Sequence, residues 1–503
     1  MRRLSHLLPA VAVALAACTA AGGDLATTVV PNAEEAEPAA VPVDAAPRGA
    51  PTPHRRILPR LQAGLADLLA EPTLDLDGTV GIAVVNDRGY VVLAHGADLP
   101  VLPASTQKLV TAAAALRGLG PDFRWATTLL ATTSPTREGF LRGDLVLVGS
   151  GDPTLASPEY AALAYPERPR ARLEELADAV AADGIRHVTG SVIGDGSYFS
   201  GPSLARGWSQ GYLDDRDAAY ASGLTVDGGL EVTYRDDGRA IGVATEDPAR
   251  TTAEVFVRLL RARGITVAGG ARSGAAPRRA REVGRVESPP LSRVLDYMVK
   301  RSDNHLADGV FLTLGAELGG RGSWTGAAAA VHAALSDLGL DWTGTVLADG
   351  SGLSRADRLT PTLLAALDRH MTRSELGDTW SGLMAVAGRT GTLRRRLRGT
   401  LADGRLLAKT GTLDDVRALA GHVVGRAGSR YHFAVVANDL HGTDRWLAYR
   451  IQDEVGLLLA EELLGCARTP KPAPSPSPSG EPSVGPFYEV ECPSPAAVTS
   501  PRP

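Results

Sequence analysis

Three short polar motifs, far apart in the chain, limit how this sequence can fold. They are Ser105-Thr106-Gln107-Lys108, Ser302-Asp303-Asn304 and Lys409-Thr410-Gly411. The second begins 197 positions after the first, and the third begins 107 positions after the second. Their hydroxyl, amide and amine groups can move protons or bind anions, but they cooperate only within hydrogen-bond reach. If they serve one reaction, the fold must bring three distant segments to one place.

Lysine is scarce in this chain, so the positions where it occurs carry information. Of the 52 residues that are Lys or Arg, only four are lysines: Lys108, Lys300, Lys409 and Lys471. Arginine cannot release its proton at accessible pH, whereas a desolvated lysine amine can. Ser105 and Lys108 begin an apolar run, Leu109–Leu116, which predicts a helix with both side chains on one face. The Lys108 amine could then accept the Ser105 proton, and the helix N-terminus would favour the developing negative charge.

The other two motifs carry groups that suit the same reaction. Ser302 and Asn304 follow a predicted helix, Leu291–Arg301, and are expected to project from the loop after it. A Ser302 hydroxyl there can pass a proton between Lys108 and a leaving amine, and the Asn304 amide can bond both Lys108 and a substrate amide. On a predicted strand, Leu406–Thr412, the Lys and Thr side chains suit a substrate carboxylate, and Gly411 lets a peptide lie close.

Taken together, the motifs resemble the Ser-x-x-Lys, Ser-Asp-Asn and Lys-Thr-Gly set of β-lactamases and penicillin-binding proteins. From about Leu58 to Leu464 the chain is similar to class C low-molecular-mass penicillin-binding proteins, the D-alanyl-D-alanine carboxypeptidase/endopeptidase family. The long interval between the first two motifs resembles this family as well, because its members carry inserted domains there. The further segments that carry the resemblance are Gly143–Leu145, Gly149–Leu155, Asp195–Phe199, Ala221–Val226, Asp349–Arg355 and Gly388–Leu393.

This resemblance implies an α+β fold of the penicillin-binding-protein and serine β-lactamase type. Its transpeptidase-like domain has a five-stranded antiparallel sheet, terminal helices on one face and a helical cluster on the other, plus an inserted α+β region. The stretch Leu230–Pro248 is shorter than in the family, which leaves the number of inserted domains open. The expected boundaries are 1–18 for a signal peptide or lipobox, 19–53 for a flexible tether, 54–155 and 286–466 for the two parts of the penicillin-binding domain, 156–285 for the insertion and 467–503 for a Pro/Ser-rich tail.

The coarse pattern of the chain predicts the main elements of that arrangement. The turn Asn86–Gly89 indicates a hairpin between the first two strands. The expected helices are Arg55–Leu69, Ala171–Ala182, Thr251–Arg263 and Asp444–Leu464, and the expected strands are Val80–Val85, Tyr90–His95, Arg417–Gly425 and Tyr431–Asn438.

The function implied by the resemblance is a serine D-Ala-D-Ala carboxypeptidase/endopeptidase that acts on peptidoglycan stem peptides through an acyl-enzyme and is acylated by β-lactams. Backbone N–H groups of Ser105 and Thr412 would form the oxyanion hole. Asp195 and Arg355 lie in segments that resemble the lining of the family's side-chain pocket. The implied catalytic residues are Ser105, Lys108, Ser302 and Asn304, and the implied substrate-binding residues are Lys409, Thr410, Gly411, Thr412, Asp195 and Arg355.

Two alternatives stay open on the sequence. One is a β-lactamase or esterase on the same scaffold, which requires fast deacylation. The other is a non-catalytic wall-binding lipoprotein, against which the intact motifs weigh. No cofactor is expected, and the ten histidines show no metal-ligand spacing. Asp152 and Asp349 lie in Gly-rich turns and are expected to fix those turns.

The amino terminus of the chain carries a signal of secretion, and two cysteines near the other end fit an oxidising compartment. Arg2 and Arg3 precede an apolar stretch, Leu7–Ala17, as in a signal peptide. Its end, Leu15-Ala16-Ala17-Cys18, resembles a bacterial lipobox, which implies a lipid anchor on Cys18; cleavage near Ala20 is the competing interpretation. Both place the protein outside the cytoplasmic membrane, where Cys466 and Cys492 can form a disulfide. The net charge of −5 and pI of about 6.1 give no reason to expect nucleic acid as a partner, and the oligomeric state cannot be read.

Overall fold

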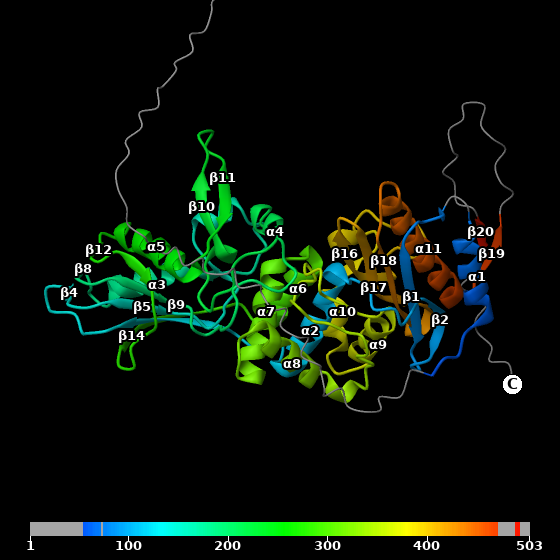
Figure 1. Ribbon diagram of the computed structural model, residues 1–503, viewed down its shortest axis with the longest axis horizontal. Coiled ribbons are helices and arrows are strands. Elements are labelled where there is room, and N and C mark those ends of the chain that lie inside the picture. The colour runs from blue at the N-terminus through cyan, green and yellow to red at the C-terminus, as the bar shows by residue number, and fades with distance from the viewer. Residues whose placement is uncertain (1–53, 72–73, 471–487, 493–503) are drawn as a thin grey trace, which may run out of the picture. The chain divides into compact units, whose positions relative to one another are not determined.

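A computed structural model describes residues 54–71, 74–470 and 488–492 (Figure 1). The predicted signal sequence, Cys18 and the predicted tether lie outside these residues. None of the helices in the described part of the chain combines the length and apolar character needed to cross a bilayer.

The three motifs lie around a six-stranded antiparallel sheet with the order β15-β16-β17-β18-β1-β2 (Figure 1). Its strands are β1 (Thr79–Asn86), β2 (Val91–His95), β15 (Ala385–Val386), β16 (Leu406–Leu413), β17 (Val416–Val424) and β18 (Arg430–Asn438). Five of them correspond to the sheet implied by the family resemblance, and the two-residue β15 extends it at one edge. Asn86 turns the chain between β1 and β2 by accepting hydrogen bonds from the backbone N–H groups of Arg88 and Tyr90, so the predicted hairpin is confirmed.

Alternating side chains on the sheet face two different cores. On β18, Phe433 and Val435 belong to the core beneath the terminal helices, whereas Ala434 and Val436 belong to the core beneath the helical cluster. This is the two-residue period of a strand that is covered on both faces. The terminal helices are α1 (Pro59–Leu69) and α11 (Asp444–Leu464). Helix α1 begins at Pro59 and not at Arg55, because residues 55–58 run beside β2 with Arg56 and Leu58 donating to backbone oxygens of that strand.

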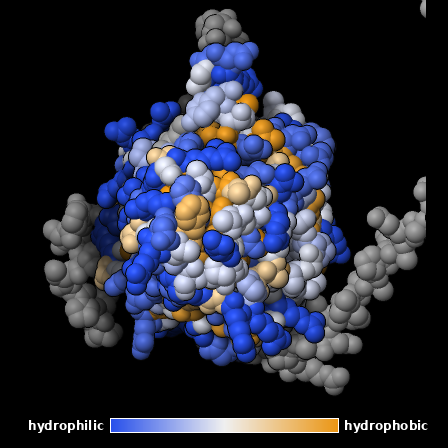
Figure 2. Space-filling model, turned by 90° about the vertical axis from the view of Figure 1, so that its left-hand side faces the viewer, coloured by the Kyte–Doolittle hydropathy of each residue, from blue (hydrophilic) through white to orange (hydrophobic). Residues whose placement is uncertain are grey.

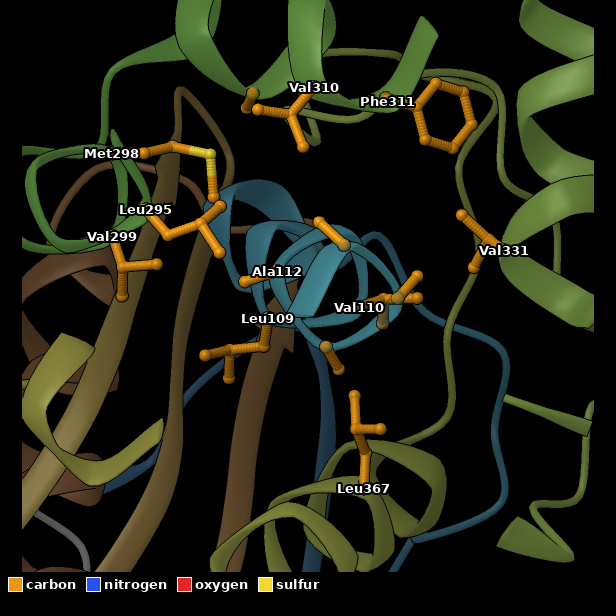
Figure 3. Packing of buried hydrophobic residues seen from close by; sticks show 14 of the residues in the cluster. Leu109, Val110, Ala112, Leu295, Met298, Val299, Val310, Phe311, Val331 and Leu367 are labelled. Atoms are coloured by element: carbon orange, nitrogen blue, oxygen red, sulfur yellow. The ribbon is translucent and has the colours of Figure 1, made fainter. Parts of the chain in front are cut away.

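Helix α2 (Gln107–Gly118) is the centre of the helical cluster, and all of its residues from 107 to 116 are buried. Figure 3 shows its side chains, including Leu109 and Val110, surrounded by apolar groups from four other helices. The cluster consists of α2, α6 (Leu291–Arg301), α7 (Asn304–Gly319), α8 (Trp324–Ala334), α9 (Pro361–Thr372) and α10 (Gly377–Leu383). A helix enclosed on every side is held rigidly, because the surrounding core is close-packed.

A second sheet, with the order β13-β9-β5-β3-β14, lies between the first two motifs. Its first strand along the chain, β3, begins at Ala126, before residue 156, the predicted start of the insertion. Strand β14 returns to pair antiparallel with β3. Helices α3 (Leu173–Ala182) and α5 (Pro248–Arg261) share a separate hydrophobic core with this sheet. Its strands are β3 (Ala126–Ala131), β5 (Leu145–Val148), β9 (Val192–Asp195), β13 (Ala271–Ser273) and β14 (Arg281–Glu287).

Short elements complete the described chain. The stretch that looked reduced in the sequence forms a hairpin, β10 (Leu230–Tyr234) and β11 (Ala240–Ala244). On the face shown in Figure 2, apolar residues are interspersed among hydrophilic ones. The other short elements are β4 (Phe140–Leu141), β6 (Leu155–Ala156), β7 (Ala171–Arg172), β8 (His187–Val188), α4 (Gln210–Asp214), β12 (Thr266–Val267), β19 (Ala467–Pro470) and β20 (Tyr488–Glu491). A disulfide joins Cys466 and Cys492 beside the β19–β20 pair, as predicted.

Candidate active site

The first motif lies where a short 3₁₀ turn, Ala104–Thr106, leads into α2. Ala104 has a positive φ of 46°, a conformation that is costly for a residue with a side chain. The turn places the Ser105 hydroxyl oxygen 3.0 Å from the Lys108 amine. Ser105 is therefore in the turn before the helix and not in its first turn, although the predicted contact with Lys108 is present.

The Lys108 amine is fully buried and has three oxygen neighbours. Besides Ser105 Oγ, they are Asn304 Oδ1 at 2.7 Å and the backbone oxygen of Ser351 at 2.6 Å. Those two oxygens can only accept hydrogen bonds. A neutral amine has two hydrogens, and donating both to these acceptors leaves its lone pair for the Ser105 hydroxyl. The geometry thus suits transfer of the Ser105 proton to Lys108.

Burial also changes the acidity of this amine. It lowers the Lys108 pKa to about 8, although the carboxylates of Asp308 and Asp349 act in the opposite direction. Burial and the neighbouring Asp349 raise the pKa of Asp308 well above its ordinary value. A lysine with a pKa near 8 is neutral in an appreciable fraction of molecules at neutral pH, as a proton acceptor must be.

The second motif connects two helices of the cluster. Ser302 ends α6 in a left-handed conformation with a φ of 61°, and Asp303 caps α7 by accepting a hydrogen bond from the Leu306 N–H. Asn304 is the first residue of α7. Its side-chain nitrogen donates to the backbone oxygen of Asp217 at 3.0 Å. The two ends of the Asn304 amide thus contact Lys108 and the inserted region.

The third motif lies on β16, with the Lys409 amine 2.9 Å from Ser302 Oγ. The same amine donates to the backbone oxygen of Thr410. Burial, together with the charge of Lys108, lowers the Lys409 pKa well below its ordinary value. Ser302 therefore connects the third motif to the second, and the Asn304–Lys108 contact connects the second to the first.

Position 411 has no room for a side chain, because neighbouring parts of the protein lie too close to it. A Cβ at this position would lie 2.9 Å from the backbone oxygen of Pro103 and 2.9 Å from the Ala418 side chain. Any larger residue would push β16 away from the turn that carries Ser105. Its neighbour Thr412 is exposed, with its hydroxyl 3.2 Å from that of Tyr449.

A loop that includes residues 349–354 contacts the site through the backbone oxygen of Ser351. Asp349 accepts hydrogen bonds from the backbone N–H groups of Ser351, Gly352 and Ser354 and from the Trp208 indole. This agrees with the predicted turn-fixing role, and the turn presents the Ser351 oxygen to Lys108. Asp152 likewise accepts from the N–H and hydroxyl of Thr154 within its own turn.

Asp195 and Arg355, the two predicted side-chain-recognition residues, have different neighbours. Asp195 is buried at the end of β9, and its carboxylate accepts from the backbone N–H groups of Ser197 and Ala276. It lines a cleft of about 320 Å³ between the inserted region and Leu312 of α7. Arg355 makes a two-pronged ion pair with Asp415 at 2.6 and 2.7 Å. Each side chain is already engaged within the protein.

One important contact had no counterpart in the sequence analysis. Arg168, from the inserted region, forms a buried ion pair with Asp303 at 3.0 Å and lies over the Tyr160 ring. Burial opposes the charge on Asp303, but Arg168 and His305 hold its pKa below the ordinary value. The two residues are 135 positions apart, and no local pattern marks their pairing.

A second unpredicted cluster contains Asp368, His422 and His432, which lie close enough together to share a metal ion. They lie in the core between α9, β17 and β18, away from the three motifs. Asp368 already accepts hydrogen bonds from both histidines and from the Trp380 indole. The cluster therefore serves as a polar contact between α9 and the sheet.

Comparisons with known proteins show the family of the chain. The chain matches the D-Ala-D-Ala carboxypeptidase 3 (S13) family over residues 61–234 and 221–460. It is 31% identical to the D-alanyl-D-alanine carboxypeptidase of Actinomadura sp. (strain R39), over 80% of this chain and 85% of that protein. It is 34% identical to carboxypeptidase DacB of Mycolicibacterium smegmatis, over 87% of this chain and 92% of that protein.

Among solved structures, penicillin-binding protein 4 of Haemophilus influenzae has the same fold, with a TM-score of 0.64 and 22% identity. The match covers 77% of this chain and 98% of that one. The motifs, the fold built around them and the matches along most of the sequence lead to one assignment: the chain belongs to the D-Ala-D-Ala carboxypeptidase 3 (S13) family of low-molecular-mass penicillin-binding proteins.

Proposed function

We propose that this protein is a serine D-Ala-D-Ala carboxypeptidase/endopeptidase that acts on peptidoglycan stem peptides through an acyl-enzyme. One observation carries the proposal: the buried Lys108 amine lies 3.0 Å from Ser105 Oγ, and its other two neighbours are acceptor-only oxygens. This arrangement supports Lys108 as the base and Ser105 as the nucleophile.

In the first step, the Ser105 proton passes to Lys108 as Oγ forms a bond to the carbonyl carbon of the penultimate D-Ala. The carbon–nitrogen bond then breaks, and the leaving amine takes a proton from Lys108 through the Ser302 hydroxyl. Asn304 orients both Lys108 and the substrate amide. Water then attacks the ester, and the Ser105 oxygen recovers its proton.

The remaining groups of the site bind the substrate. Lys409 and Thr410, with Thr412, hold the carboxylate of the leaving residue. A carboxylate beside Lys409 favours the protonated amine, against the effects of burial and Lys108 on its pKa, and the threonine hydroxyls can donate to the carboxylate oxygens. The backbone N–H groups of Ser105 and Thr412 stabilise the oxyanion. Gly411 allows β16 to approach the Ser105 turn, because a Cβ at this position would come within 2.9 Å of the Pro103 oxygen.

Recognition of a stem-peptide side chain by Asp195 and Arg355 stays a prediction. The cleft beside Asp195 supports it, whereas the hydrogen bonds of Asp195 and the Arg355–Asp415 ion pair supply both residues with partners inside the protein. Action on peptidoglycan places the protein outside the cytoplasmic membrane. An anchor on Cys18 would hold it to the outer face of that membrane.

Mass spectrometry after incubation with a penicillin tests the proposed function. We expect one covalent adduct at Ser105 that persists for minutes, together with release of D-Ala from a stem pentapeptide. Rapid turnover of the drug would instead support the β-lactamase alternative. No adduct at all would support the non-catalytic wall-binding alternative.

A further inference from the structure

A cleft of about 410 Å³ lies between one side of α6, from Arg293 to Arg301, the segment around Glu167 in the inserted region and the loop from Gly391 to Arg394. Six charged side chains line it: Glu167, Arg293, Asp296, Lys300, Arg301 and Arg394. None of these residues belongs to the three motifs.

The charges in this cleft do not cancel. Glu167 pairs with Arg301, and Asp296 pairs with Lys300 on the next turn of α6. Arg293 and Arg394 are both exposed, and neither has an acidic partner among the residues that the structure describes. Two uncompensated guanidinium groups make the cleft a site for anions, and their planar forks match carboxylates.

The position of the cleft relative to Ser105 indicates which part of a substrate would reach it. Thr410, proposed to hold the carboxylate of the leaving residue, donates its hydroxyl to Thr392 at 2.8 Å. Thr392 lies between Gly391 and Arg394, which form one wall of the cleft. The opposite wall, α6, ends at Ser302. The cleft therefore adjoins the leaving-group side of the site.

We propose that this cleft binds the carboxylates of the second stem peptide in a cross-linked substrate; the inference rests on the proposed function. When a single D-Ala leaves, its one carboxylate is held by Lys409 and Thr410. When a cross-link is cut, the leaving amine belongs to a second peptide with its own C-terminal carboxylate. Arg293 and Arg394 bind that additional charge and favour endopeptidase over carboxypeptidase substrates.

The test compares three substrates in the full-length protein: a monomeric stem pentapeptide, a cross-linked peptide dimer, and the same dimer with the second stem amidated at its C-terminus. The double variant Arg293→Ala/Arg394→Ala removes both unpaired cations. Its matched control, Arg278→Ala/Arg279→Ala, removes two exposed cations from a loop outside the cleft. Acylation by a penicillin is measured for every protein.

We expect wild type and control to cleave the free-acid dimer with a kcat/KM about three- to tenfold above that for the amidated dimer, as two exposed ion pairs allow. In Arg293→Ala/Arg394→Ala this ratio falls to about one, mainly through KM, while pentapeptide hydrolysis and penicillin acylation stay unchanged. Added salt should reduce the wild-type ratio as well.

Two results would overturn the inference and leave the proposed function standing. The double variant could keep the wild-type preference for the free-acid dimer, or wild type could hydrolyse the pentapeptide and leave the dimer intact. Failure of the wild-type protein to form any penicillin adduct would overturn the proposed function itself.

Discussion

At the residue scale, the distinction between lysine and arginine decides the chemistry of Ser105. We expect Lys108→Arg to lower the penicillin acylation rate by about 10² to 10⁴, the usual contribution of a general base. The guanidinium stays protonated and is too bulky for a site that is closed by Asn304 and Ser351. Stopped-flow acylation measures the effect.

The matched control for this variant is Arg117→Lys, an exchange of the same two residue types on α2. Arg117 pairs with Asp337 at the protein surface, away from the motifs, and its replacement should leave acylation unchanged. Near wild-type acylation by Lys108→Arg would show that Lys108 acts only through its charge.

The pH dependence of acylation follows from the same amine. Burial lowers the Lys108 pKa to about 8, so the amine is a cation below that pH and a neutral base above it. We expect the second-order acylation rate to rise from about pH 6, to reach half of its maximum near the pKa, and to level off above about pH 9. A rate that stays flat or falls across this range contradicts the assignment of Lys108 as base.

At the scale of elements, the Arg168–Asp303 ion pair joins the insertion to the second motif, and we expect it to position that motif. Replacing Arg168 by Met leaves Asp303 buried without its partner, which should destabilise the protein by about 3 kcal/mol. Displacement of the cap of α7, and with it of Asn304, should slow acylation by about 10². Both are measured, by urea denaturation and by penicillin acylation well below the melting temperature.

Two further variants separate positioning from general destabilisation. Arg168→Lys should recover part of the acylation rate, because it restores a cation beside Asp303. Arg170→Met, which removes an exposed cation two residues away, should change neither quantity. Full acylation by folded Arg168→Met would show that the insertion does not position the motif.

The contact between α9 and the sheet should make stability depend on pH. In this contact Asp368 accepts a hydrogen bond from His432. Burial opposes a charge on either side chain, but the hydrogen bonds and opposite charges around them lower the pKa of Asp368 below 3.8 and raise the pKa of His432 above 6.5. The Asp368 contribution is present above pH 3.8 and is lost as the pH falls through its folded pKa. The His432 contribution is present below pH 6.5 and is lost as the pH rises through its folded pKa.

We therefore expect Asp368→Asn to lower the free energy of unfolding by about 3 kcal/mol between about pH 4 and pH 6.5, and by less outside that window. Urea denaturation across pH measures the difference. Asp378→Asn, at an exposed position on α10, is the matched control. A difference independent of pH would indicate that the cluster contributes by packing alone.

At the scale of the whole molecule, the location of the protein is predicted from the sequence before residue 54. The lipobox-like Leu15-Ala16-Ala17-Cys18 and the following tether predict a membrane anchor. We expect Cys18→Ala to move the protein from the membrane fraction to the soluble extracytoplasmic fraction, with penicillin acylation unchanged. Immunoblots of the fractions test this, and a wild-type protein already in the soluble fraction would contradict it.

The sequence alone determined the parts of this protein that depend on local pattern. Helices α6 and α11 have their predicted bounds, because apolar spacing and flanking residues are local signals. The three motifs predicted which side chains form the candidate active site, because the types and order of their residues are typical of serine acyl-enzymes.

Only the tertiary structure decided how those groups meet. The Lys409–Ser302, Asn304–Lys108 and Arg168–Asp303 contacts each join residues more than 100 positions apart. Lys108 owes its lowered pKa to burial, because α2 is enclosed by the other helices of the cluster. The cationic cleft exists because α6 and the loop near Thr392 lie side by side. Burial and long-range pairing are properties of the assembled core, which no short segment encodes on its own.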